Sequence, residues 1–217
     1  MMLSLFDIYD PYSYYFSLSL NWLLLFFLYL TIFSLYWVLI NNLIYIFIEF
    51  VMFLFKDFKL FFDSLKLMKG SLIFFISIFL YILMLNIMGL MPYYFSITSH
   101  MVFSFFLSFP FWLSFFFFSW WGFTNKTFAH LIPMGTPVFL IPLMVLIETI
   151  SNLIRSGSLA VRLVSNMISG HLLMSLLGDC GVSMLVLHFI LFIFEFFVCF
   201  IQSYVFSALL TLYSSEV

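Results

Sequence analysis

The chain has 217 residues, of which 66% are hydrophobic and only 7% are charged. Soluble domains carry about 25% charged residues, so this composition excludes a water-soluble surface. The formal net charge of −2 gives no electrostatic support for binding nucleic acid. The two cysteines, Cys180 and Cys199, are too few for a disulfide framework or a metal cluster. We therefore predict an all-α polytopic membrane protein with no nucleic-acid partner, no metal and no cofactor.

The apolar runs are about 20 residues long or longer, which is the length that crosses a hydrocarbon layer about 30 Å thick. They predict about five membrane crossings within one membrane domain, residues 1–217. Trp22, Tyr36 and Trp37 lie near the ends of the first run, where amphipathic rings favour the membrane interface. In chain order, the crossings are expected at residues 18–40, 72–91, 101–121, 140–177 and 183–213.

Residues 43–69 are predicted to form an interfacial amphipathic helix instead. Their charged positions recur at steps of three, four or seven and so share one helical face, with Phe and Leu opposite: Glu49, Lys56, Lys59, Asp63 and Lys66. Lysines concentrate in this segment, so the positive-inside rule keeps it on the side of synthesis, which is the matrix in a mitochondrion. We accordingly expect the N-terminus in the intermembrane space and the C-terminus in the matrix.

The last two apolar segments are too long to cross a membrane upright. As continuous helices, residues 140–177 and 183–213 would measure roughly 57 Å and 46 Å. Either both helices are strongly tilted, which we favour, or the first breaks at residues 156–158, Ser-Gly-Ser.

A polar stripe runs along the first of these helices. Positions at steps of three and four form it: Glu148, Asn152, Arg155, Leu159, Arg162, Asn166 and Ser169. Ionisable groups inside a membrane cost about 2.5–3.5 kcal/mol each on insertion scales, so each is a candidate functional residue. Arg162 is far from both ends of the segment and keeps its charge, so it must find an anion on another helix or chain. Pairing with Glu148 or snorkelling to the interface is an equally open interpretation for Arg155.

His171 lies nine residues after Arg162, on the opposite side of the helix, so the two groups serve different parts of a site. On the last helix, His188, Glu195 and Gln202 are spaced by seven and share a face. Glu195 needs a polar neighbour to tolerate burial. We predict that His171 and Glu195 face each other as a proton-relay station, with about 3–6 Å between their polar atoms.

The sequence shows no paired nucleophile and base, no phosphate-binding glycine loop and no metal-ligand cluster, so we expect no active site within this chain. Transport is the remaining class of function. A secondary transporter with its own midplane substrate site should show repeat symmetry, which is not evident. A purely structural anchor leaves Arg162, His171 and Glu195 unexplained. We interpret His100 and His188 as packing residues.

Several segments of the chain together form a recognisable signature. The most specific is the block LAVRL around Arg162, and the others are residues 89–92, 129–133, 135–137, 146–151, 166, 170–173 and 201–206. In this order, and over about two thirds of the chain, they resemble the signature of the subunit a family of mitochondrial F-type ATP synthases. The two ends, residues 18–22 and 212–217, resemble arthropod versions.

This resemblance implies a non-catalytic, multi-pass proton-channel subunit of the Fo sector in the mitochondrial inner membrane. Its partners would be the rotating c-ring, the peripheral stalk, other Fo subunits and membrane lipid. Arg162 would face the ionisable carboxylate of the ring and separate two aqueous half-channels. The proton-path residues would be His171, Glu195, Gln202, Asn166 and Glu148, with Gln202 beside Arg162.

The sequence departs from the family pattern in two places. Ser156 stands where the family usually has proline, and the stretch between Gly181 and Glu195 is several residues shorter than usual. The second departure leaves open how the half-channel beside the last helix is entered.

Overall fold

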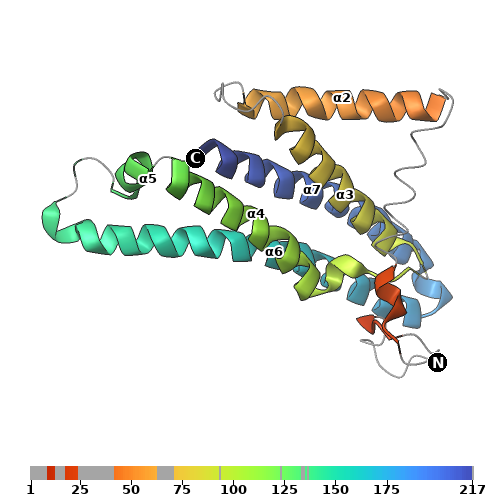
Figure 1. The fold of residues 1–217 in the computed structure, drawn as a ribbon. Coiled ribbons are helices and arrows are strands. Elements are labelled where there is room, and N and C mark those ends of the chain that lie inside the picture. The colour runs from red at the N-terminus through yellow and green to blue at the C-terminus, as the bar shows by residue number, and fades with distance from the viewer. Residues whose placement is uncertain are drawn as a thin grey trace.

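The computed structural model describes residues 9–12, 18–23, 42–62, 71–92, 94–122, 124–132, 135 and 137–216. All regular structure in these residues is helical, as predicted (Figure 1). Most of the predicted first crossing, residues 18–40, and the end of the predicted interfacial helix lie outside them. The helices are η2 (Leu20–Leu23), α2 (Asn42–Phe62), α3 (Ser71–Leu90), η4 (Ile97–Ser99), α4 (Met101–Gly122), α5 (Thr124–Leu131), η5 (Val138–Leu140), α6 (Ile141–Asp179), η6 (Val182–Met184) and α7 (Leu185–Glu216).

Helix α2 is amphipathic. Leu54 and Phe58 are buried against α3 and α7, whereas Lys56 and Lys59 are exposed on the other side. Figure 1 shows α2 lying over α3 and the C-terminal half of α7, and the ring of Phe50 in α2 contacts the rings of Phe79 in α3 and Phe200 in α7. Such a helix, with an apolar face inward and lysines outward, suits the surface of a membrane.

Four helices of the described residues are long and apolar enough to cross a membrane: Leu72–Leu90, Met101–Gly122, Val138–Asp179 and Leu185–Ser214. The chain is therefore an all-α polytopic membrane protein, as its composition predicts. Phe79 and Ile82 of α3 are buried and form part of the main apolar core with Phe206 and Leu210 of α7. Helix α3 is thus the central helix, packed between α2 and α7.

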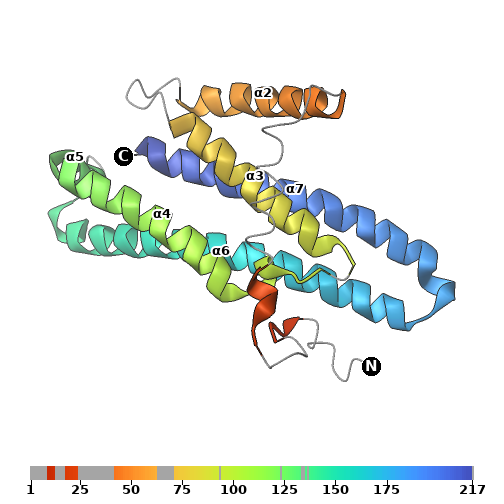
Figure 2. The ribbon, with the colours of Figure 1, turned by 45° about the vertical axis from the view of Figure 1, so that its right-hand side comes forward.

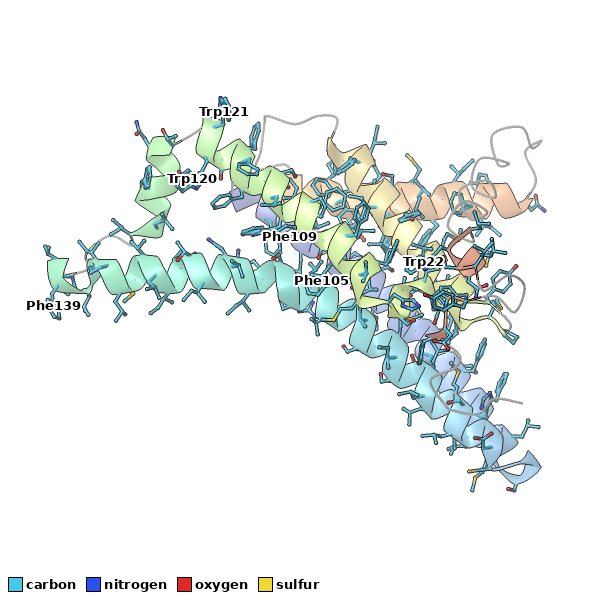
Figure 3. All side chains as sticks on the ribbon, turned by 60° about the horizontal axis from the view of Figure 1, so that its bottom comes forward. Trp22, Phe105, Phe109, Trp120, Trp121 and Phe139 are labelled. Atoms are coloured by element: carbon cyan, nitrogen blue, oxygen red, sulfur yellow. The ribbon has the colours of Figure 1, made fainter. Side chains whose placement is uncertain are left out.

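Helix α4 presents aromatic side chains outward. Phe105, Phe109, Trp120 and Trp121 are exposed, and Figure 3 shows them at successive points along the helix, with Trp120 on the side of α5, where its ring meets that of Phe128. Lipid tails accept such a surface without the cost that water would impose. This face suits contact with lipid.

The connection between α3 and α4 packs its histidine among aromatic rings. The ring of His100 lies 5.2 Å from that of Trp22 and 5.1 Å from that of Phe95, between centroids. Burial lowers the pKa of His100, although a backbone hydrogen bond with Tyr9 and the charge of Asp10 act in the opposite direction. These contacts agree with the interpretation of His100 as a packing residue.

Helix α6 is one uninterrupted helix of 39 residues, so the break considered at residues 156–158 does not occur. It would be about 58 Å long if straight, which fits the predicted strong tilt. Figure 3 shows it bending in its middle. Here the hydroxyl of Ser156 donates to the carbonyl of Leu153 (2.9 Å) and that of Ser158 to the carbonyl of Arg155 (3.0 Å). Such back-bonding bends a helix without breaking it.

Helices α6 and α7 form an antiparallel hairpin, and Figure 2 shows them running side by side. Gly181 closes the turn between them with a φ of 82°, a conformation that glycine adopts without steric cost. The hairpin places the polar stripe of α6 beside α7, the helix that carries His188, Glu195 and Gln202. It thereby positions the candidate site.

Candidate functional site

One hydrogen bond joins the polar positions of α6 and α7. The amide nitrogen of Asn166 donates to the side-chain carbonyl of Gln202 at 2.8 Å, and Gln202 is only 5% exposed. Because Asn166 follows Arg162 by one helical turn, this bond lies at the edge of the Arg162 face. The structure thus brings Asn166 and Gln202 together near Arg162.

Arg162 lies at the boundary between the packed face and the exposed face of α6. Its neighbour Leu163 is buried, its neighbour Val161 is exposed, and the arginine itself is half-buried. No carboxylate among the described residues forms an ion pair with it. A guanidinium cannot shed its charge, so this position requires an anion from outside those residues.

Arg155 has a different environment. Its guanidinium carbon lies 5.0 Å from the centre of the Tyr213 ring, near the end of α7. A cation over an aromatic face is stabilised by about 0.5–2 kcal/mol. Arg155 therefore contacts the hairpin partner helix directly, which favours a structural role for this arginine.

Glu148 lines a pocket of about 630 Å³ between α4, α5, α6 and α7. The pocket mixes aromatic rings from α4 with polar groups from α6: Trp112, Phe115, Phe116, Ser119, Trp120, Thr127, Leu131, Glu148, Thr149, Asn152, Leu153, Arg155 and Tyr213. Glu148 precedes His171 by about 35 Å along the helix axis. Helix α6 thus has a polar region near each end.

Glu195 is buried in the membrane-spanning part of α7, with 6% of its surface exposed. Its carboxylate rests on the backbone of Gly170 in α6, so closely that a Cβ atom added at Gly170 would overlap the carboxyl carbon and Oε2 and would lie 2.7 Å from Oε1. Gly170 immediately precedes His171. The structure therefore places Glu195 beside the His171 segment of α6.

The Nε2 atom of His171 is buried and has no hydrogen-bond partner in the described part of the chain. The ring of Tyr9 meets the His171 ring edge-on, 6.5 Å between centroids, and the Tyr9 hydroxyl donates to the carbonyl of Ile168 at 3.2 Å. Tyr9 therefore contacts α6 at two places. The sequence did not predict this, because nothing in it indicates that the N-terminal segment reaches α6. The predicted relay between His171 and Glu195, directly or through one water, stays a prediction.

A second buried polar group, missed in the sequence, lies next to these residues. Asn86 of α3 is 0% exposed, and neither polar atom of its side chain has a partner in the described residues. Its backbone carbonyl accepts a hydrogen bond from the thiol of Cys199, at 3.9 Å, and Cys199 lies one helical turn from Glu195. Unpaired buried amides are places where ordered water binds in proteins. An asparagine in an otherwise apolar run was the available signal.

We predict that Asn166→Leu and Gln202→Leu each destabilise the α6–α7 hairpin. Each change leaves the other amide of the bond without its partner, at a cost of about 1–3 kcal/mol for a buried group. The double variant should lose much less than the sum of the two single effects, because it removes both halves of one bond. The measurement is the thermal unfolding of the purified protein in detergent.

The matched control is Ser169→Ala, because the Ser169 hydroxyl is exposed and bonds only the carbonyl of Asn166 in its own helix (3.1 Å). It should keep the normal stability. Fully additive losses of stability in the double variant would show that the Asn166–Gln202 bond has no role of its own.

These features define a polytopic membrane protein whose ionisable side chains are gathered between two long antiparallel helices. The family model for the ATP synthase A chain matches residues 15–215. Three insect proteins named ATP synthase subunit a align over the whole of both chains: 47% identical from Aedes aegypti, 48% from Drosophila yakuba and 45% from Locusta migratoria. The chain belongs to the ATP synthase A chain family.

Proposed function

We propose that this chain is the proton-conducting stator subunit of the membrane sector of a mitochondrial ATP synthase. The observation that carries the proposal is the arrangement along the α6–α7 hairpin. Arg162 lies mid-helix without a carboxylate partner among the described residues, between the Glu148 pocket and the Glu195 region. An unneutralised, permanent cation between two separate polar regions suits a partner carboxylate that arrives and leaves.

In the proposed mechanism, two aqueous half-channels open to opposite sides of the membrane and do not meet. A proton enters through the first, neutralises a carboxylate on the rotating ring, and travels in lipid as part of a neutral acid. It leaves through the second after nearly a full turn. Arg162 favours the ionised carboxylate between the two channels and so prevents a direct leak.

Glu195 and His171 are assigned to the half-channel on the intermembrane side. Both lie toward the α6–α7 turn, and Glu195 is one of the few ionisable groups buried there. The unpaired Asn86 amide nearby offers hydrogen bonds to water in the same region. A carboxylate and an imidazole connected through water can pass a proton between them.

Glu148 is assigned to the half-channel on the matrix side. It lines the pocket at the other end of the stripe, beyond Arg155 and near the C-terminal end of α7. The exposed lysines of α2, Lys56 and Lys59, support this orientation through the positive-inside rule. Each proton that crosses releases about 2.3 kcal/mol per 100 mV of membrane potential.

The proposed partners are the c-ring, the peripheral stalk, other Fo subunits and the lipid of the mitochondrial inner membrane. Isolation of the native complex through a tag on another stator subunit tests this assignment. We expect this chain to be recovered together with a ring of small subunits that carry an intramembrane carboxylate. Absence of this chain from that complex, or its recovery without such a ring, would favour a secondary transporter and contradict the proposal.

A further inference from the structure

Gly170 occupies a position in α6 that its backbone does not require to be glycine. It lies inside a continuous helix, and its φ is not among the positive values found at Gly135 and Gly181. Glycine inside a helix is less favourable than alanine by about 1 kcal/mol. The reason for a glycine here must therefore be the space that a side chain would fill.

That space is occupied by the carboxyl group of Glu195. All three of the nearest atoms to a Cβ built on Gly170 belong to this group, the farthest of them, Oε1, at 2.7 Å. At Gly157 and Gly178 of the same helix, a Cβ would meet no atom within 4 Å. The contact is thus particular to Gly170 among these three glycines.

Weakly polar groups lie within one helical turn of this contact. The Cys199 thiol, one turn from Glu195, approaches the Sδ atom of Met167 at 3.9 Å and the carbonyl of Asn86 at the same distance. Met167 and Gly170 lie on one face of α6, because they are three residues apart. The carboxylate therefore rests in a recess whose floor is the backbone of Gly170.

We propose that Gly170 is a positioning residue for Glu195. Its missing side chain forms the recess that receives the carboxylate and sets the position of that group beside the His171 segment. The inference rests on the proposed role of Glu195 in proton transfer. It adds that the position of the carboxylate, and not only its presence, determines the rate.

Gly170→Ala tests this inference. The methyl group overlaps the present position of the carboxylate, and the flexible Glu195 side chain gives way more easily than the helix backbone. A displacement of about 1 Å in a reacting group can reduce a rate about 100-fold. We expect proton-driven ATP synthesis by the assembled, reconstituted complex to fall at least about tenfold.

Rescue by a shorter acid separates positioning from general packing. Glu195→Asp alone withdraws the carboxylate from the recess by one methylene and should also reduce synthesis. In Gly170→Ala/Glu195→Asp, the new methyl group fills part of the space that the shorter side chain leaves. The rate should recover several-fold relative to Gly170→Ala, because the shorter acid no longer overlaps the methyl group. Gly178→Ala, a glycine substitution with free space in the same helix, should keep the normal rate.

A normal rate in Gly170→Ala, or a loss without recovery in the double variant, overturns the positioning role. Failure of the proposed function gives a different result, because Glu195→Gln would then also support normal synthesis. If Glu195→Gln is inactive and Gly170→Ala is normal, only the present inference fails.

Discussion

Glu195→Gln is expected to reduce proton-driven ATP synthesis at least about 100-fold, the usual scale for losing a group that transfers protons. Glutamine has nearly the same shape and fits the recess on Gly170, but it cannot bind and release a proton. The substitution also removes an ionisable group from the membrane, so insertion should not be impaired. The measurement is ATP synthesis by the complex in liposomes under an imposed proton gradient, at equal amounts of assembled complex.

Ser203→Ala in α7 is the matched control for this prediction. Ser203 is completely buried and Glu195 is nearly so, but the Ser203 hydroxyl donates to the carbonyl of Phe200 in its own helix at 2.8 Å. We expect its rate to stay near normal. Equal rates for Glu195→Gln and Ser203→Ala would remove Glu195 from the proton path.

The membrane fold could be predicted because hydrophobic length sets helix length in lipid. The apolar runs indicated α3, α4, α6 and α7 for this reason. The continuity of α6 was harder to predict, because Ser156, Gly157 and Ser158 are compatible with either a break or a bend. In the structure α6 is continuous through these residues. The hydroxyls of Ser156 and Ser158 donate to carbonyls three residues earlier.

The candidate site was only partly predictable, because a sequence pattern reports one helix at a time. The stripe on α6 and the spacing of seven on α7 indicated Asn166 and Gln202 separately, and their hydrogen bond depends on how the hairpin packs. The contact of Arg155 with Tyr213 joins positions far apart in the chain, so neither residue indicated this contact in the sequence. Gly170 was indicated only as part of the matching segment 170–173, since a missing side chain carries no signal until its neighbour is known.

Arg162→Ala is expected to abolish proton-driven ATP synthesis while the protein remains inserted and assembled. Removing a charge that costs free energy in the membrane should not hinder insertion, so the defect must come from the lost partner of the ring carboxylate. Arg162→Lys should fail or nearly fail as well. Lysine is a compact charge that can lose its proton in a dry site, whereas a guanidinium keeps its charge.

Arg155 is the internal control, because it lies seven residues earlier on the same stripe and contacts the Tyr213 ring. Its replacement by alanine should loosen the hairpin and reduce the rate only moderately, since a cation–π contact contributes about 0.5–2 kcal/mol.

The most direct test of the central role of Arg162 is the rate of proton-driven ATP synthesis in proteoliposomes containing either the Arg162→Ala or the Arg155→Ala complex. The proposed mechanism predicts no synthesis in the first and substantial synthesis in the second. Normal synthesis with Arg162→Ala together with its loss in Arg155→Ala would assign the central cation to Arg155 and contradict the mechanism.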